Sequence, residues 1–261
     1  MKRIKRVLFV FWHGLGDNIL ATPAIRKYKQ TTGNFVGWAM LRRFKAAELF
    51  KQHPCVDQVH WVSDAWNDFG PYAKGRVAVT KEAKALAVKH DYDELKIIMH
   101  QDRGSHKIPG TAAEMGVMLG SDVHTEVYYN TTEVRALVKA ASLPDEYVFF
   151  HGSTGLPKKD LPRTAAEAWL HRRGVDLPLV SPDFTWDHTK MPISFALEVM
   201  RGAKHIVVVD SVMYHAAHAM DLKVDLAYFA RGLSVWKRVH PLHVAKETIS
   251  YNLDAIKCGL L

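Results

Sequence analysis

The residues with the clearest chemical potential lie in segment 12–24, which reads WHGLGDNILATPA. Gly14 and Gly16 stand one residue apart, and Asp17 follows directly. Glycines at this spacing allow a sharp turn with positive φ and leave room for another molecule to approach the main chain. The Asp17 carboxylate can cap the helix that follows or act in a crevice above the strand ends, and both interpretations are open at this point.

A second polar segment, HGSTG at 151–155, follows a strand-like run in the second half of the chain. Ser153 and Thr154 can offer N–H and O–H donors to phosphate oxygens, and Lys158 and Lys159 follow as point charges. Taken alone, the segment is equally typical of an ordinary loop with a basic tip.

A third segment begins with Asp210 and Ser211, directly after the apolar run HIVVV at 205–209. The two residues fall at the start of a predicted helix, where they suit capping and anion binding equally well. His215 lies about one helical turn further along the same face.

Two patterns resemble metal sites, but neither has the position or spacing that a bound metal needs. Asp91 and Asp93 form an Asp-x-Asp pair, yet the pair precedes its predicted strand and so lies at the wrong edge of the sheet for a site. Two histidine pairs, His215 with His218 and His240 with His243, could each face across a helical turn, but no nearby Cys or carboxylate completes a zinc-binding spacing. We therefore expect no metal site.

Alternating strands and helices must position these segments. Continuous apolar runs predict buried parallel strands near 7–11, 35–40, 56–62, 95–100, 147–150, 177–180, 205–209 and 224–229. Helices are predicted near 19–32, 42–52, 81–90, 164–173 and 193–202, and a last helix carries Ile249, Leu253 and Ile256. This alternation predicts an α/β fold, whose sites form at the carboxyl ends of the strands.

Three connecting segments are predicted as loops. Segment 63–75 contains Trp66 and Phe69, whose rings can pack locally or form an acceptor-binding wall. Segment 100–107, HQDRGSHK, ends a predicted strand and ranks second among the candidate acceptor contacts. Segment 230–238 is expected to be a loop.

The length of 261 residues exceeds the usual size of a single core, and a polar hinge at 142–146 divides the chain. We expect domains at 1–141 and 142–242, followed by a C-terminal helical segment at 243–261.

The composition is that of a soluble globular protein, with 48% hydrophobic and 24% charged residues. No apolar run approaches the roughly 20 residues of a membrane span, and no signal peptide is apparent. Cys55 and Cys258 have no metal or disulfide spacing, so we expect a cytoplasmic protein. The net charge of +8 favours anionic partners: phosphorylated small molecules, an anionic membrane surface or nucleic acid.

The three polar segments together resemble the motifs of the lipopolysaccharide heptosyltransferase family, a group of glycosyltransferases with the GT-B fold. Residues 14–24 resemble its opening motif closely. His151, Gly152 and Ser153, with Lys158 or Lys159 and the pair Leu161-Pro162, resemble the second, and Asp210-Ser211 with residues 215–217 resembles the third. Their order and approximate spacing fit over nearly the whole chain.

The resemblance implies two Rossmann-like domains that face each other across a cleft, with the C-terminal helix returning to the N-terminal domain. It implies an inverting, metal-independent glycosyltransferase of lipopolysaccharide biosynthesis. Such an enzyme moves a sugar from a nucleotide-diphosphate donor, such as ADP-heptose, to a hydroxyl of an anionic glycan or glycolipid. No further cofactor is implied, and the acceptor implies peripheral contact with the inner membrane surface.

By position, the resemblance makes Asp17 the general base of an acceptor-binding first domain. The binding residues that it implies are Gly14, Gly16, Ser153, Thr154, Lys158, Lys159, Asp210, Ser211 and His215, the last seven around the donor diphosphate of a nucleotide-sugar-binding second domain. Val212 replaces a glycine of the third motif, and a β-branched residue cannot take positive φ cheaply. We therefore expect the backbone there to stay further from a phosphate.

Two alternative functions remain open. A glycosyltransferase that acts on modified bases in DNA would suit the basic charge. A protein that binds nucleotide sugars but has lost catalysis would keep the same motifs.

Overall fold

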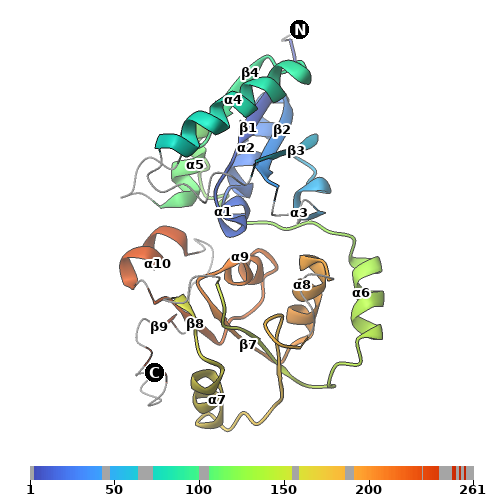
Figure 1. Cartoon of the computed structure of the whole chain (residues 1–261), viewed down its shortest axis with the longest axis vertical. Coiled ribbons are helices and arrows are strands. Elements are labelled where there is room, and N and C mark those ends of the chain that lie inside the picture. Colours follow the sequence, from blue (N-terminus) through green and yellow to red (C-terminus); the bar gives the residue numbers. More distant parts are fainter. Residues whose placement is uncertain are drawn as a thin grey trace. The chain divides into compact units, whose positions relative to one another are not determined.

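The computed structural model describes residues 3–42, 48–63, 73–99, 106–154, 159–185, 191–230, 232–240, 249–250, 253 and 256. The chain forms two compact units, each with a parallel sheet (Figure 1). The first comprises residues 1–123 and 127–129, and the second comprises residues 124–126 and 130–261. Each unit is described by itself below.

The first unit is built on a parallel sheet with the strand order β3-β2-β1-β4. The strands are β1 (Arg6–Val10), β2 (Phe35–Leu41), β3 (Gln58–Val62) and β4 (Glu94–Ile97). The chain runs outward from β1 to β3 and then returns to the other side of β1. The strand order therefore reverses between β1 and β4, and a crevice forms at the carboxyl ends of two strands at such a point.

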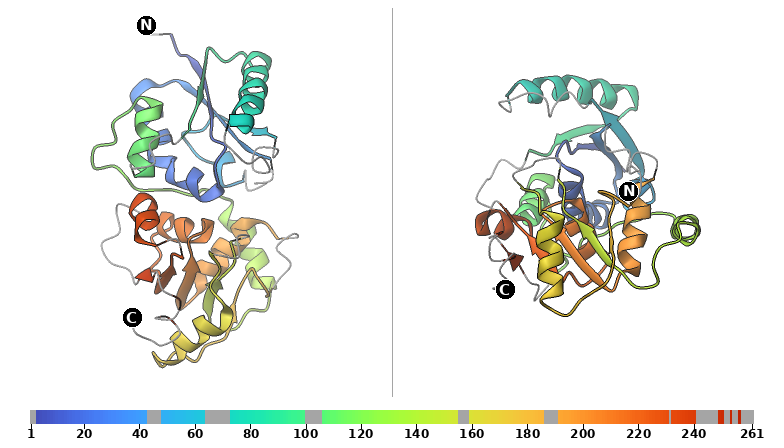
Figure 2. Two further views of the ribbon diagram at one scale, coloured as in Figure 1. Left: turned by 60° about the vertical axis from the view of Figure 1, so that its left-hand side comes forward. Right: turned by 60° about the horizontal axis from the view of Figure 1, so that its bottom comes forward.

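Both faces of this sheet are covered, because successive side chains of a strand point to opposite faces. Leu8 and Val10 of β1 pack with Val79 and Ala83 of α4 (Ala73–Lys89). On the other face the ring of Phe9 meets that of Tyr28 in α2 (Thr22–Thr32) edge-on at 4.8 Å. The left view of Figure 2 shows α4 on one side of the sheet and α2 with α5 (Lys107–Met115) on the other. The remaining helices of this unit are α1 (Leu15–Leu20) and α3 (Glu48–Lys51).

The second unit has a parallel sheet with the order β6-β5-β7-β8-β9. Its strands are β5 (Val148–His151), β6 (Leu179–Val180), β7 (His205–Val209), β8 (Leu226–Tyr228) and β9 (Ile249–Ser250). Here the strand order reverses between β5 and β7, so the second switch point lies where HGSTG and Asp210-Ser211 leave the sheet.

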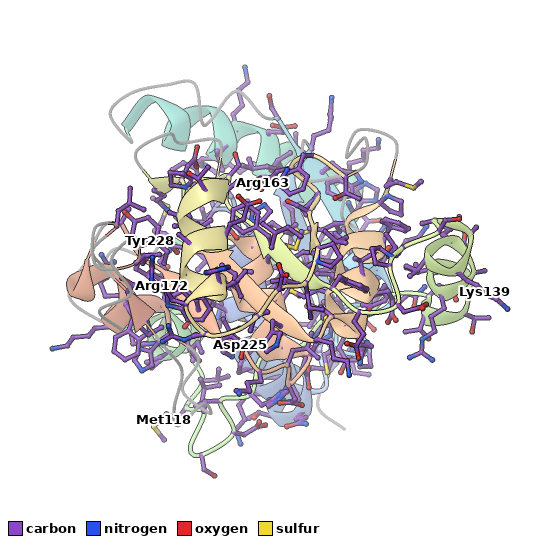
Figure 3. All side chains as sticks on the ribbon, turned by 90° about the horizontal axis from the view of Figure 1, so that it is seen from below. Met118, Lys139, Arg163, Arg172, Asp225 and Tyr228 are labelled. Carbon is purple, nitrogen blue, oxygen red and sulfur yellow. The ribbon has the colours of Figure 1, made fainter. Side chains whose placement is uncertain are left out.

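Helices cover this second sheet as well. Trp169 of α7 (Arg163–His171) joins Phe150 and Val207 in one buried cluster, and Figure 3 shows α7 against the sheet with Arg163 and Arg172 at its ends. On the opposite face the ring of Tyr214 packs on Phe229. That face carries α8 (Ile193–Gly202) and α9 (Val212–Ala219), and α6 (Thr131–Ala140) packs on α8. Helix α10 (Leu233–Val239) follows β8.

Most predicted elements are confirmed, including the parallel pairing and the run 205–209 as a strand. Helix α2 carries Pro23 in its first turn and ends at Gly33, whose φ of 65° is left-handed. Segment 230–238 is wrongly predicted as a loop, because residues 233–239 form α10. Ile249 lies in β9 rather than in a helix, so β9 and not the segment 224–229 forms the edge of the sheet. Residues 131–140, for which no helix was predicted, form α6 and belong to the second compact unit, although the expected boundary placed them in the first domain.

Near the C-terminus, Leu253 and Ile256 are helical and pack on the core of the second unit. Arg172 ties this segment down by donating to the Ile256 carbonyl oxygen at 2.6 Å. The return of a C-terminal helix to the first domain stays a prediction. Within the described residues, no helix has the length and apolar character that crossing a membrane requires.

Candidate functional site

The turn after β1 differs from its expected geometry. Gly14 has a φ of −55° as the N-cap of α1, and Gly16 lies inside that helix, so the predicted positive φ at these glycines is wrong. The reason is that only residues 11–14 connect β1 to α1, and this short connection contains no left-handed residue. A Cβ on Gly14 would lie 3.5 Å from Asp17 Oδ2, an ordinary contact, so the backbone here is open rather than strained.

Asp17 is the third residue of α1 and not its N-cap. Its carboxylate accepts a hydrogen bond from the Lys107 ammonium, which comes from the first residue of α5. The side chains of Asp17 and Lys107 are 20% and 21% exposed, so the pair is open to a ligand. This geometry argues against the helix-cap interpretation of Asp17 and favours a role at the carboxyl edge of the sheet, by the β1/β4 switch point.

His13 lies beside this pair in the same turn. Burial is the largest influence on His13 and lowers its pKa, and the Lys107 ammonium lowers it further. The Asp17 carboxylate and a hydrogen bond with the Ile98 backbone raise the pKa but do not offset the burial. A lowered pKa keeps the imidazole neutral at physiological pH. The first unit thus presents a carboxylate, an ammonium and a neutral imidazole at one edge of its sheet.

At the edge of the second sheet, Lys159 donates to Asp210 Oδ2 at 2.8 Å. Ser211 is the N-cap of α9, and its hydroxyl accepts from the Met213 N–H at 3.3 Å. The same hydroxyl lies 3.0 Å from Nδ1 of His151, at the end of β5. The two segments predicted to bind phosphate therefore meet at the β5/β7 switch point.

His151 links three strand ends at this edge. Its Nε2 lies 3.9 Å from Oδ1 of Asp183, which follows β6 and whose Oδ2 accepts from the Gly152 N–H at 2.8 Å. Burial lowers the pKa of His151, and the carboxylates of Asp183 and Asp160 oppose that shift. The imidazole is therefore neutral at physiological pH.

The other predicted binding residues are placed as follows. The N–H and hydroxyl of Thr154 both donate to Asp160 Oδ1, at 2.8 and 3.2 Å, whereas Ser153 is exposed. His215 is buried in α9, one turn after Ser211, with its ring edge-on to Tyr214. Lys158 lies outside the described residues.

Val212 does not hinder the third motif in the way expected. It is the first residue of α9 and has no positive φ, so a β-branched side chain fits its backbone without strain. The N-terminus of α9 is the positive end of the helix dipole and remains suited to an anion.

Sequence reasoning missed three polar partners, namely Lys107, Asp160 and Asp183. Lys107 was within a segment selected for its place after a strand, but no role was assigned to it, and residues 100–105 lie outside the described part. Asp183 follows β6, so the rule that polar residues gather at the carboxyl edge of a parallel sheet could have found it. Asp160 carries no such signal, because its role depends on how the loop folds back on Thr154.

In the described part of the chain, no three His, Cys, Asp or Glu side chains are grouped closely enough to hold a metal ion. The Asp-x-Asp pair is structural at Asp93, whose carboxylate oxygens accept from the Arg3 side chain at 2.7 Å and from the Arg6 N–H at 2.8 Å. Both contacts lie at the amino end of β1, as expected for a pair at the wrong edge for a site.

Several solved structures share this arrangement of strands and helices. A glycosyl transferase of family 9 from Veillonella parvula matches over 98% of this chain and 88% of its own, with a TM-score of 0.68 and 12% identity. The E. coli heptosyltransferase WaaC with ADP-2-deoxy-2-fluoro heptose matches over 98% and 97%, with a TM-score of 0.59 and 17% identity. E. coli ADP-heptose lps heptosyltransferase II matches over 94% and 90%, with a TM-score of 0.66 and 11% identity.

The chain has the heptosyltransferase fold. No protein-family model matches the sequence, and no curated protein sequence matches it. At these low identities the heptosyltransferase fold is what the comparisons establish, and the activity has to be argued from the site.

Proposed function

We propose that this protein is an inverting, metal-independent glycosyltransferase that moves a sugar from a nucleotide-diphosphate donor to a hydroxyl of a glycan or glycolipid. The observation that carries the proposal is the shared fold together with the polar groups at its two switch points. The first sheet has Asp17 at its edge, and the second has Lys159 and the N-terminus of α9. These are the groups that such a transfer needs on its acceptor side and its donor side.

On the acceptor side, Asp17 is the proposed general base. It takes the proton of the acceptor hydroxyl while the oxygen attacks the anomeric carbon from the face opposite the diphosphate. A single displacement of this kind inverts the configuration, and the bond to the diphosphate oxygen breaks as the new glycosidic bond forms.

On the donor side, the leaving diphosphate gains negative charge and needs fixed positive groups. Lys159 fits this role because its ammonium lies at the β5/β7 switch point, 2.8 Å from Asp210 beside the N-cap Ser211. The sequence alone left the choice between Lys158 and Lys159 open, and this contact favours Lys159. We propose an ADP-heptose-like donor, because the structural neighbours include WaaC with an ADP-heptose analogue and an ADP-heptose heptosyltransferase.

The net charge of +8 supports an anionic acceptor and, with a glycolipid, peripheral contact with the cytoplasmic face of the inner membrane. We propose the two units as partners in one reaction, with the first unit mainly on the acceptor side and the second on the donor side.

A ligand screen followed by a transfer assay tests the proposal. Thermal shift against ADP, UDP and GDP and their sugars should give a stabilising response for one nucleotide, since a specific ligand raises stability by mass action. No response from any of them would count against the proposal. Asp17→Asn should keep the melting temperature and donor affinity and lower turnover by about 10²–10⁴-fold. Unchanged turnover would show that Asp17 is not the base.

The same measurements separate the two alternatives. A DNA acceptor, which the basic charge would suit, predicts tight duplex binding that weakens steeply with salt. A protein that has lost catalysis predicts donor binding with neither transfer nor slow donor hydrolysis.

A further inference from the structure

The contact between Lys107 and Asp17 joins the proposed base to a cation. Lys107 donates to Asp17 Oδ1, from the first residue of α5 to the first turn of α1. An ammonium beside a carboxylate favours the charged form of the carboxylate. A base held in this way takes up a proton less readily, so the closed pair restrains the chemistry that Asp17 is proposed to perform.

The backbone of Lys107 is fixed even though its side chain is long. His106 caps α5 by accepting from the Ile108 N–H at 3.2 Å, and Ile108 is fully buried. At the other end of α5, Glu114 accepts from the Met99 N–H at 2.5 Å. A change of partner by Lys107 therefore involves its four-carbon side chain alone, which rotates readily and carries a compact charge.

The pair can be reached by a ligand, because about a fifth of each side chain is exposed. A phosphate or carboxylate group close to the acceptor hydroxyl would compete with Asp17 for the Lys107 ammonium. His13 also lies beside the pair, and because burial lowers its pKa, its imidazole does not compete as a cation. His106 precedes Lys107 in the chain, and its ring caps α5.

We propose that Lys107 is a specificity-determining residue that binds an anionic group of the acceptor, and that its transfer from Asp17 to that group frees the base. The proposal rests on the assignment of Asp17 as the general base. It means that an acceptor with the anion activates the enzyme, whereas an uncharged analogue leaves Asp17 restrained.

A titration of the Asp17 carboxyl by ¹³C NMR tests the pair without requiring catalysis. Lys107→Met should move the titration midpoint to higher pH by about 1–3 units, because the opposite charge is lost. Inorganic phosphate should move the midpoint of the unmodified protein in the same direction and leave that of Lys107→Met unchanged. Equal midpoints in the two proteins, or no effect of phosphate on the unmodified protein, would overturn the proposal.

The matched control is Lys29→Met. Lys29 forms an ion pair of similar exposure with Asp57, at 2.6 Å and with side chains 26% and 29% exposed, away from the switch point. This variant should titrate at Asp17 like the unmodified protein and respond to phosphate in the same way. Lys107→Arg keeps the charge and should keep the phosphate response, and melting temperatures check that each variant folds.

A kinetic comparison uses a methyl glycoside acceptor and its phosphate monoester. For Lys107→Met we expect kcat on the uncharged glycoside to rise, by at most about tenfold for each unit of midpoint shift, and KM for the phosphate monoester to rise about tenfold or more. A fall in kcat on both acceptors would mean that Lys107 only supports the fold, and would overturn the proposal. Absence of any transfer would count against the proposed function, while the NMR result would still decide the pairing.

Discussion

The most quantitative prediction concerns His60 in the first unit and the effect of acid on that unit. His60 is 6% exposed in β3; its Nε2 lies 2.8 Å from the Tyr92 hydroxyl, and its ring centroid lies 4.5 Å from that of His90. Burial, with smaller contributions from His90, Arg6 and Lys89, lowers the pKa of His60 from 6.5 to about 4.

The sign and size of the effect follow from these two pKa values. Below pH 6.5 His60 binds a proton in the unfolded chain, whereas in the folded chain it does so only near pH 4. The free energy of unfolding therefore falls as the pH falls through this window. The full loss is about 3 kcal/mol, and about 2 kcal/mol of it is reached by pH 5, where most carboxylates are still charged.

The assay is urea unfolding at about pH 7.5 and pH 5, with the first unit followed by hydrogen exchange in peptides from β1 and β3. His60→Gln should lose about 2 kcal/mol less than the unmodified protein between the two pH values, because its side chain does not titrate. His171 of α7 provides a control, since it is exposed in the second unit and His171→Gln should leave hydrogen exchange in the β1 and β3 peptides like that of the unmodified protein. An equal fall in the free energy of unfolding between the two pH values, in the unmodified protein and in His60→Gln, would refute the reasoning.

Further predictions concern the two sheet edges. A Cβ on Gly152 would lie 2.4 Å from the Leu161 carbonyl oxygen, so Gly152→Ala should cost about 1–3 kcal/mol in urea unfolding. Gly14→Ala should change stability by no more than about 0.5 kcal/mol, since its Cβ meets only an ordinary contact; equal costs would contradict the difference in packing. Lys159→Met should weaken ADP binding about tenfold or more in calorimetry, because hydrogen bonds to charged groups contribute about 1.5–3 kcal/mol. The exposed Lys223 serves as its control, and equal affinity in Lys159→Met and Lys223→Met would remove Lys159 from the donor site.

The sequence predicted the parts of the fold that local pattern determines. Continuous apolar runs such as 205–209 are typical of strands buried on both faces of a parallel sheet, and their alternation with helices led to both switch points. Strand β9 has only two residues, and its pairing with β8 depends on a neighbour more than twenty residues away, so a helical spacing around Ile249 was misleading.

The sequence predicted those site residues that follow the ends of strands. It did not predict the contacts that these residues make with side chains far away in the sequence. Asp210 and Ser211 were found because they come directly after a buried strand, and Asp17 because it lies in the turn and first helix that follow one. The contact of Asp17 with Lys107 spans 90 residues and depends on the docking of α5, which a short-range pattern does not report. The positive φ expected at Gly14 and Gly16 was wrong because glycine's ability to adopt it was taken as evidence that it is adopted. The chain enters α1 without a left-handed residue.

The carboxylates at the edge of the second sheet have a consequence for how this edge recognises a ligand. Each donor that a diphosphate would use here already has a carboxylate partner. The Gly152 N–H donates to Asp183, the Thr154 N–H to Asp160, and the Lys159 ammonium to Asp210. Binding of a diphosphate is therefore an exchange, in which a ligand oxygen replaces a carboxylate oxygen on the same donor. Each exchange gains less than the new contact alone would give, so inorganic diphosphate by itself should bind more weakly than the proposed donor. Selectivity for the proposed donor then depends mainly on the contacts of its nucleoside and sugar.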